Sequence, residues 1–185
     1  MITFQKRYVE NTKLLNVCKF IADAIMVIVF AYVLILFSCD RTTIVGGSMQ
    51  NSIANGDTVL INRMAYCVSG PKRNAIVAFE PSGLESSKIY VKRVIGLPGE
   101  TIQIKNGKVY INGNVLENDI SEDNILTPGI ASNEIKLGSD EYFVLGDNRN
   151  NSEDSRFANI GIVKRSHIVG SVWMIMTPFS HMSLI

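Results

Sequence analysis

The sequence predicts a mostly β protein with one N-terminal transmembrane helix. Two observations carry this prediction. The first is an apolar run near the start that is long enough to cross a bilayer. The second is a series of short β-branched and aromatic runs beyond residue 40, separated by Gly, Asn, Pro and Asp. With 185 residues, the chain has room for this helix and one domain of ordinary size.

The apolar run extends from Phe20 to Ser38 and contains one charged residue, Asp23. About 20 apolar residues in a helix match the thickness of the hydrocarbon core, so a helix over 20–38 is expected to span a membrane. Asp23 lies one turn from the inner end, where its carboxylate can reach the lipid headgroups. The run has no amphipathic period, which argues against a helix buried in a soluble core.

The charges beside the span predict its orientation. Basic residues precede it in excess over the single acidic residue Glu10, and Arg41 is the only basic residue close behind it; the preceding ones are Lys6, Arg7, Lys13 and Lys19. By the positive-inside rule, residues 1–19 are cytoplasmic and residues 40–185 form an extracytoplasmic domain of a single-pass cell-membrane protein. A cleaved secretory signal would also export the domain, but the sequence LFSCDRTT has no A-x-A cleavage pattern.

The charge balance argues against nucleic acid as a partner. Lys and Arg number 18 against 17 Asp and Glu, which gives no overall basic field. The three cysteines cannot all pair, and Cys18 and Cys39 would lie about 30 Å apart across a helical run. A bridge between Cys39 and Cys67 and free thiols both stay open, and no function is assigned to the cysteines.

Strands are expected wherever β-branched and aromatic residues cluster between turn residues. The ranges are 58–62, 75–79, 88–95, 101–105, 108–111, 141–145 and 168–176. Asn106-Gly107 and Asn112-Gly113 predict tight hairpins, because Asn and Gly tolerate the positive φ angles of such turns. Residues 101–140 are therefore expected to form a small hairpin and cap insertion, in which the polar stretch 117–139 is a loop or short cap without clear chemistry.

A serine after two glycines is the first candidate for chemistry. Gly46 and Gly47 let the backbone approach a ligand closely, and an N–H at Ser48 could stabilise the charge that develops on a carbonyl oxygen. Gly-Gly-Ser is also common in plain turns, so the serine needs a base nearby to be functional. His167 and His181 have no orienting carboxylate beside them in the sequence, which makes a Ser/His/Asp arrangement a weak reading.

Lys92 is the stronger candidate for that base. In the strand KIYVKRVI the period of two places Tyr90, Lys92 and Val94 on one face, so the lysine points out between apolar neighbours. Desolvation lowers the pKa of an ammonium from about 10.4 and can supply a neutral amine near neutral pH. The alternative is an exposed lysine that protects an edge strand from pairing.

The segment GDNRNNSEDSR at 146–156 is dense in charged and amide groups. Asp147, Arg149, Asp154 and Arg156 are suited to holding a loop in one shape through charge-assisted hydrogen bonds. A solvated loop of mixed charge is the alternative.

Together, these segments resemble bacterial type I signal peptidases over nearly the whole chain. The matching boxes are GGSM at 46–49, GDTVLIN at 56–62, KRVIGLPGE at 92–100 and GDNRNNSEDSR at 146–156. The resemblance implies that Ser48 is the nucleophile, that Lys92 is the general base and that Ser152 hydrogen-bonds the lysine amine. It also implies a supporting ion pair between Asp154 and Arg156.

The same resemblance implies the substrate and the pockets that bind it. Such enzymes cleave signal peptides from exported preproteins that carry small residues one and three positions before the cut. Ile44, Val45, Met49, Tyr90 and Val91 would line the pockets for these small residues. The resemblance implies no metal and no organic cofactor. Trp173 and Phe179, in the apolar segment 172–179, would touch the membrane surface or pack in the core.

Two departures from the family pattern are present. The nucleophile is usually followed by Met, any residue, Pro and Thr, whereas Gln50, Asn51 and Ser52 follow Met49 here. Gly46 stands where some members carry a hydroxyl that serves as an oxyanion donor. The first departure leaves open whether the enzyme processes many exported proteins or a specialised few.

Two rival readings remain. The self-cleaving repressors of the DNA damage response use a related β domain with Ser and Lys, but they are cytosolic and carry a DNA-binding part. A non-enzymatic anchored β domain that binds exported proteins would be expected to lack the nucleophile or the base. The anchor argues against the first reading, and the presence of both Ser48 and Lys92 argues against the second.

Overall fold

The computed structural model describes residues 12–81, 88–121 and 123–185. It divides into two compact units, residues 1–38 and residues 39–185. Residues 1–11, which make up much of the predicted cytoplasmic segment, lie outside the described part of the chain.

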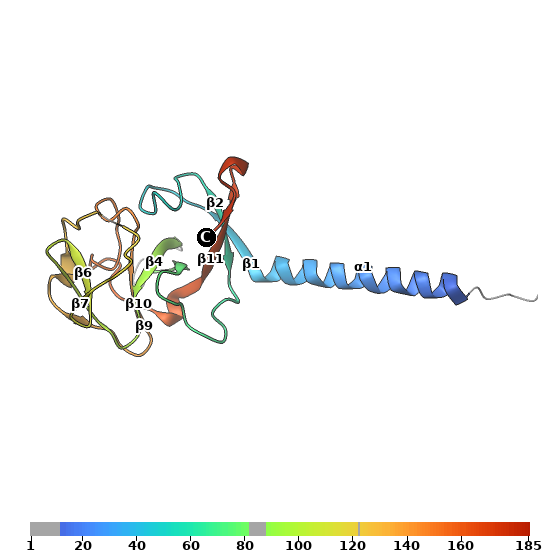
Figure 1. The fold of residues 1–185 in the computed structure, drawn as a ribbon, viewed down its shortest axis with the longest axis horizontal. Coiled ribbons are helices and arrows are strands. Elements are labelled where there is room, and N and C mark those ends of the chain that lie inside the picture. The colour runs from blue at the N-terminus through green and yellow to red at the C-terminus, as the bar shows by residue number, and fades with distance from the viewer. Residues whose placement is uncertain (1–11, 82–87, 122) are drawn as a thin grey trace, which may run out of the picture. The chain divides into compact units, whose positions relative to one another are not determined.

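The first unit contains the helix α1, Thr12–Ser38, which is 27 residues long (Figure 1). Its stretch Lys13–Val33 has a mean hydropathy of 2.1, and within the described ranges α1 is the one helix long and apolar enough to cross a membrane. The predicted helix over 20–38 is therefore present, and it begins earlier than predicted. Most of the apolar side chains described along α1 are exposed, as expected for a helix that spans a lipid bilayer.

The second unit is built from two antiparallel sheets, and the prediction of a mostly β protein is confirmed. The larger sheet has eight strands in the order β1-β2-β11-β3-β4-β9-β10, with β12 paired to β11. Its strands are β1 (Cys39–Thr43), β2 (Thr58–Asn62), β3 (Ile76–Phe79), β4 (Tyr90–Gly96), β9 (Glu141–Leu145), β10 (Val163–Lys164), β11 (Ile168–Thr177) and β12 (Ser183–Leu184).

The smaller sheet has the strand order β7-β6-β5-β8. Its strands are β5 (Thr101–Lys105), β6 (Lys108–Ile111), β7 (Asn114–Val115) and β8 (Ile135–Lys136). Figure 1 shows β6 and β7 at one end of this domain and β1 and β2 at the other. Both predicted hairpins are present, since Asn106, Gly107, Asn112 and Gly113 all have positive φ angles, from 51° to 82°.

All seven predicted strands form, four of them with the predicted bounds. The longest strand that sequence reasoning missed is β1, which reads Cys-Asp-Arg-Thr-Thr. It is an edge strand that pairs only with β2, so it lacks the apolar alternation that marks a half-buried strand. The other missed strands, β7, β8, β10 and β12, have two residues each and are too short to give a periodic signal.

The buried side chains form three clusters. Ile44, Met49 and Ile53 belong to the cluster beneath β2 and β11, so apolar anchors lie on both sides of Ser48 in the chain. In β4, six of seven residues are buried, because the strand lies between β3 and β9 inside the larger sheet. Both segments that carry the candidate chemistry are thus attached to the core.

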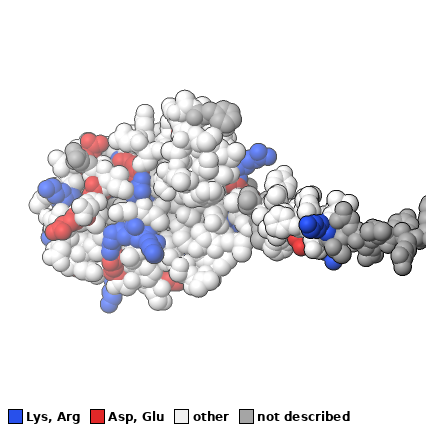
Figure 2. All heavy atoms as spheres, turned by 45° about the vertical axis from the view of Figure 1, so that its right-hand side comes forward, with Lys and Arg blue, Asp and Glu red and all other residues white. Residues whose placement is uncertain are grey.

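On the face seen in Figure 2, basic and acidic side chains lie mixed together on one part of the domain, and a broad area beside them carries few charges.

Candidate active site

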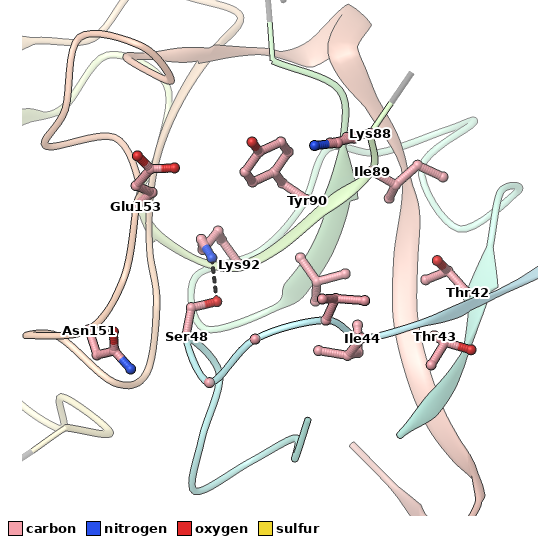
Figure 3. Close-up of a pocket in the computed structure, with 14 residues that line it drawn as sticks. Thr42, Thr43, Ile44, Ser48, Lys88, Ile89, Tyr90, Lys92, Asn151 and Glu153 are labelled. Atoms are coloured by element: carbon pink, nitrogen blue, oxygen red, sulfur yellow. Dashed lines mark hydrogen bonds between the residues drawn. The ribbon is translucent and has the colours of Figure 1, made fainter. Parts of the chain in front are cut away.

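Ser48 and Lys92 meet in the folded domain. Ser48 lies in the turn that follows β1, and Lys92 lies in the middle of β4, 44 residues further along the chain. Lys92 Nζ is 2.5 Å from Ser48 Oγ. The dashed line in Figure 3 marks this hydrogen bond. The structure therefore brings the two residues that the sequence singled out into direct contact.

The position of β4 explains why Lys92 is shielded from solvent. The strand pairs with β3 on one side, where Lys92 lies opposite Val77, and with β9 on the other. Lys92 is 4% exposed. The alternative reading of an exposed lysine on an edge strand is wrong, because β4 is an interior strand of the sheet.

This burial lowers the pKa of the Lys92 amine. Desolvation lowers the pKa of Lys92 from 10.5 to about 8, while the negative charges of Asp154, Glu153 and Asp147 oppose the shift. With that pKa, about one amine in ten is neutral at pH 7. A buried, partly neutral amine next to a hydroxyl is an arrangement that can activate a serine for attack.

The turn before Ser48 depends on glycine. Gly46 has a φ angle of +105°, which non-glycine residues rarely adopt, and its N–H donates to Asn55 Oδ1 at 2.9 Å. A Cβ built on Gly46 would meet no atom within 4 Å, so this side of the turn is open. The Ser48 N–H donates no hydrogen bond to any residue in the described ranges. It is thus available to a ligand.

The closing segment, defined here as residues 146–156, packs directly on the serine turn. Asn148 N–H donates to the Ser48 carbonyl oxygen at 3.1 Å. A Cβ on Gly146 would lie 2.5 Å from that oxygen and 2.2 Å from Ser152 Oγ, so only glycine fits at this position. Ser152 is therefore adjacent to the site.

The hydroxyl of Ser152 has no hydrogen-bond partner in the described part of the chain, although it is buried. A hydrogen bond from Ser152 to the Lys92 amine, which the family resemblance implies, is thus not formed in this structure. The role of Ser152 in orienting the amine stays a prediction.

A buried ion pair holds the closing segment in shape. Arg156 binds both carboxylate oxygens of Asp154, at 2.8 and 2.9 Å. Asp154 also accepts a hydrogen bond from Gly146 N–H at 3.1 Å, and Arg156 donates to the Arg149 carbonyl oxygen at 2.5 Å. Because these partners lie in the closing segment, the pair fixes the backbone that touches Ser48.

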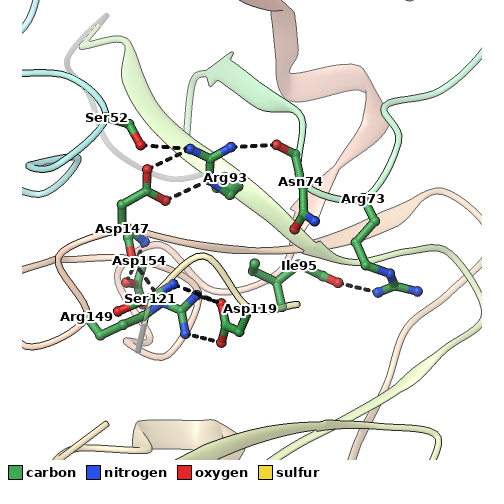
Figure 4. Close-up of polar contacts among 11 residues, drawn as sticks. Ser52, Arg73, Asn74, Arg93, Ile95, Asp119, Ser121, Asp147, Arg149 and Asp154 are labelled. Atoms are coloured by element: carbon green, nitrogen blue, oxygen red, sulfur yellow. Dashed lines mark hydrogen bonds and ion pairs between the residues drawn. The ribbon is translucent and has the colours of Figure 1, made fainter. Parts of the chain in front are cut away.

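A second buried ion pair was not foreseen from the sequence. Arg93, the neighbour of Lys92, binds both oxygens of Asp147 at 2.7 Å and donates to Ser52 Oγ at 3.0 Å and to the Asn74 carbonyl oxygen at 2.7 Å (Figure 4). The arginine thus connects the serine turn, the closing segment and the turn that precedes β3. A charged pair of residues, Lys92-Arg93, inside an apolar strand is the sequence signal that could have located this network.

The stretch 117–139, for which the sequence offered no role, covers the closing segment. Asp119 forms two hydrogen bonds to the guanidinium of Arg149, one of them at 2.6 Å. Further along the stretch, the Thr127 carbonyl oxygen accepts from Arg156 Nη1 at 3.1 Å, and Ile130 N–H donates to the Arg156 carbonyl oxygen at 2.9 Å. The cap therefore supplies partners for both buried arginines.

A cavity of about 560 Å³ opens beside the serine. Its walls are residues 42–48 and 88–92, together with Asn151 and Glu153. Of the predicted substrate-binding residues, Ile44, Val45, Tyr90 and Val91 line it. The prediction for Met49 is not supported, because its side chain is fully buried in the core and is not part of the cavity wall.

Several wall residues were not foreseen from the sequence: Thr42, Thr43, Lys88, Ile89, Asn151 and Glu153. They belong to the edge strand β1, to the two residues that precede β4 and to the exposed side of the closing segment. The fold, and no local sequence pattern, determines which of these side chains face the cavity.

The two histidines lie apart from Ser48. His181 Nδ1 lies 3.4 Å from Asp57 Oδ1, and this pair lines a second cavity of about 400 Å³ with residues 50–54. His181 thus has a carboxylate beside it that the sequence did not suggest, while Ser48 lines the other cavity. Cys18, Cys39 and Cys67 are free. In the described ranges, no three His, Cys, Asp or Glu residues gather as metal ligands would.

Trp173, predicted to touch the membrane or to pack in the core, is 38% exposed on β11. The side chain of Phe179 lies outside the described residues.

Comparison with known proteins identifies the family of this chain. The family model for signal peptidase, peptidase S26, matches residues 17–177. A probable signal peptidase I-2 from Synechocystis is 33% identical over 154 residues, which are 80% of this chain and 68% of the relative. A signal peptidase I P from Bacillus subtilis subsp. natto is 31% identical over 188 residues, 98% of both chains.

A solved signal peptidase I from Enterococcus faecalis is 34% identical and covers 57% of this chain and 98% of its own, with a TM-score of 0.45. The family model alone spans far more than half of the residues. The chain therefore belongs to the signal peptidase family, peptidase S26, and is a serine peptidase.

Proposed function

We propose that this protein is a membrane-anchored endopeptidase that removes signal peptides from exported preproteins, with Ser48 as the nucleophile and Lys92 as the general base. The observation that supports this most is the 2.5 Å contact between Lys92 Nζ and Ser48 Oγ, made by a lysine that is almost fully buried. The names of its relatives supply the substrate class.

In the proposed reaction, neutral Lys92 takes the proton of Ser48 as Oγ attacks the scissile carbonyl carbon. The protonated amine then gives that proton to the leaving nitrogen as the peptide bond breaks, which leaves an acyl-enzyme. Lys92 next takes a proton from a water molecule, whose oxygen attacks the ester carbonyl carbon. As the ester bond breaks and the signal peptide is released, the ammonium of Lys92 returns that proton to Ser48 Oγ. The available N–H of Ser48 would stabilise the oxyanion of both tetrahedral intermediates.

The shape of the cavity fits an extended peptide with small side chains. The residues before the cut would lie between 42–46 and 88–91, with a side chain directed toward Ile44 and Val91. Both of these residues are themselves buried against the core and cannot withdraw to admit a large group. This packing supports the preference for small residues at the first and third positions before the cut, which the family resemblance implies.

The helix α1 would anchor the enzyme in the cell membrane, since it is long and apolar enough to cross it. The excess of basic residues before the apolar run places the N-terminus in the cytoplasm and the catalytic domain outside.

The test uses the full chain in detergent micelles with a labelled preprotein. We expect the wild-type protein to release the mature protein with a single new N-terminus. Ser48→Ala and Lys92→Ala should each lower kcat by at least about a thousandfold, since neither half of a nucleophile and base pair acts alone. Circular dichroism spectra of both variants should match the wild type. Full cleavage by either variant would overturn the assignment.

A further inference from the structure

The cavity beside Ser48 continues past the two reactive side chains to a part that the proposed reaction does not use. In Figure 3, Ser48 and Lys92 lie between two sets of wall residues, with Ile44 and Thr43 on one side and Asn151 and Glu153 on the other. Asn151 and Glu153 come from the exposed side of the closing segment. Among the described residues that line the cavity, Glu153 carries the single carboxylate.

The direction of a bound substrate follows from the proposed function, on which this inference rests. If the residues before the cut lie between 42–46 and 88–91, the scissile carbonyl carbon must reach Ser48 Oγ. The residues after the cut then leave toward the side where Asn151 and Glu153 lie. These two side chains would be the first that the beginning of the mature protein meets.

We infer that Glu153 is a specificity-determining residue that favours preproteins with a basic side chain at the first position after the cut. Glu153 is an exposed acidic residue in the wall of the cavity. It attracts a Lys or Arg of the substrate and repels an Asp or Glu. Asn151, beside it, offers an amide that can hydrogen-bond to the substrate backbone.

The proximity of Glu153 to the reaction centre has a second effect that must be separated from specificity. Its negative charge raises the pKa of Lys92 and so reduces the fraction of neutral amine. Removing this charge should speed the cleavage of all substrates at neutral pH. The ratio of kcat/KM between two peptides cancels this common factor and isolates the preference.

The experiment measures kcat/KM of the full-length enzyme for two peptides that differ only in Lys or Glu at the first position after the cut. We expect the wild type to favour the Lys peptide about threefold to tenfold, as exposed charges at short range do. The preference should disappear in Glu153→Gln and reverse in Glu153→Lys. It should also shrink in 0.5 M salt, because the charges are exposed to solvent.

Glu134→Gln is the matched control, since Glu134 is an exposed carboxylate next to β8 and outside the cavity. This control should keep the wild-type ratio. Equal rates for both peptides in a wild-type enzyme that cleaves them would overturn the role of Glu153 and leave the proposed function intact. A charge preference only at positions before the cut would also overturn it. A wild-type enzyme that cleaves neither peptide nor a preprotein would instead refute the proposed function itself.

Discussion

The guanidinium of Arg93 donates a hydrogen bond to Ser52 Oγ at 3.0 Å, so the residue beside the proposed base holds the turn that carries the proposed nucleophile. The same guanidinium binds both carboxylate oxygens of Asp147 in the closing segment. Ser52 stands where the family usually has threonine, and its hydroxyl keeps the same hydrogen-bonding capacity. The three-way contact therefore couples the position of Ser48 to that of Lys92.

Ser52→Ala should loosen this coupling. The substitution leaves one N–H of a buried arginine without its partner, which costs about 1 kcal/mol in the free energy of unfolding. We expect kcat to fall about threefold to tenfold with little change in KM, because the distance between Ser48 and Lys92 becomes less well fixed. Steady-state kinetics on a signal-peptide substrate will measure this. Ser52→Thr keeps the hydroxyl and should retain activity; equal losses in both variants would show that the hydrogen bond is not responsible.

Asn51 explains why the family's proline is absent from this turn. Its φ angle is +91°, whereas proline is restricted to about −65°. Asn51→Pro, which restores the family pattern, should therefore lower the free energy of unfolding by more than about 1 kcal/mol and reduce kcat. Asn51→Gly relieves the strained φ angle and should be neutral or slightly stabilising. Thermal unfolding and kinetics of both variants test this, and a fully active Asn51→Pro enzyme would show that the turn can adopt another conformation.

The rate of cleavage should follow the deprotonation of Lys92. Its pKa is lowered to about 8 by burial, and the neutral amine is the form that can accept a proton from Ser48. We expect kcat/KM to rise with pH, to reach half of its plateau near pH 8, and to fall about tenfold per unit at lower pH. The measurement is a pH profile of the full-length enzyme between pH 5.5 and 9.5. A flat profile across this range would mean that the amine is not the titrating base.

Much of the fold was readable from the sequence, because its signals are local. The apolar run from Phe20 to Ser38 and the hairpins at Asn106-Gly107 and Asn112-Gly113 depend only on neighbouring residues, and all three appear as expected. Strand β1 was missed because an edge strand needs no apolar alternation. Its polar residues form a strand because β2 offers a free edge to pair with.

In the candidate site, too, some contacts could be predicted from the sequence and others could not. The contact between Ser48 and Lys92 could be anticipated from the family resemblance, and so could the ion pair between Asp154 and Arg156. Met49 was predicted to line the substrate pocket, but the direction of a side chain in an irregular turn depends on packing. Here the Met49 side chain packs in the hydrophobic core. The contact of Arg93 with Ser52 joins positions 41 residues apart, and no local pattern predicts it.

The last test concerns the cap, residues 117–139, because its residue Asp119 supplies the negative charge that pairs with the buried guanidinium of Arg149. Arg149 is 1% exposed, and Asp119 is the carboxylate with which it forms an ion pair. Asp119→Ala leaves the guanidinium buried and without an opposite charge in contact, which should cost about 3 kcal/mol in the free energy of unfolding. Because Arg149 also donates to the Gly146 carbonyl oxygen, next to the contact with Ser48, kcat should fall as well.

The matched control for this test is Asp123→Ala, which removes an exposed carboxylate from the same cap. Urea unfolding of the full chain in micelles, followed by tryptophan fluorescence, compares the two variants. If the cap only covers the surface, both substitutions will lower the free energy of unfolding and kcat by equally small amounts. If the cap fixes the closing segment, Asp119→Ala will lower both stability and kcat, whereas Asp123→Ala will not. Asp119→Asn keeps one acceptor oxygen for Arg149 but loses the second acceptor and the charge, so its effect should lie between those of Asp119→Ala and the wild type.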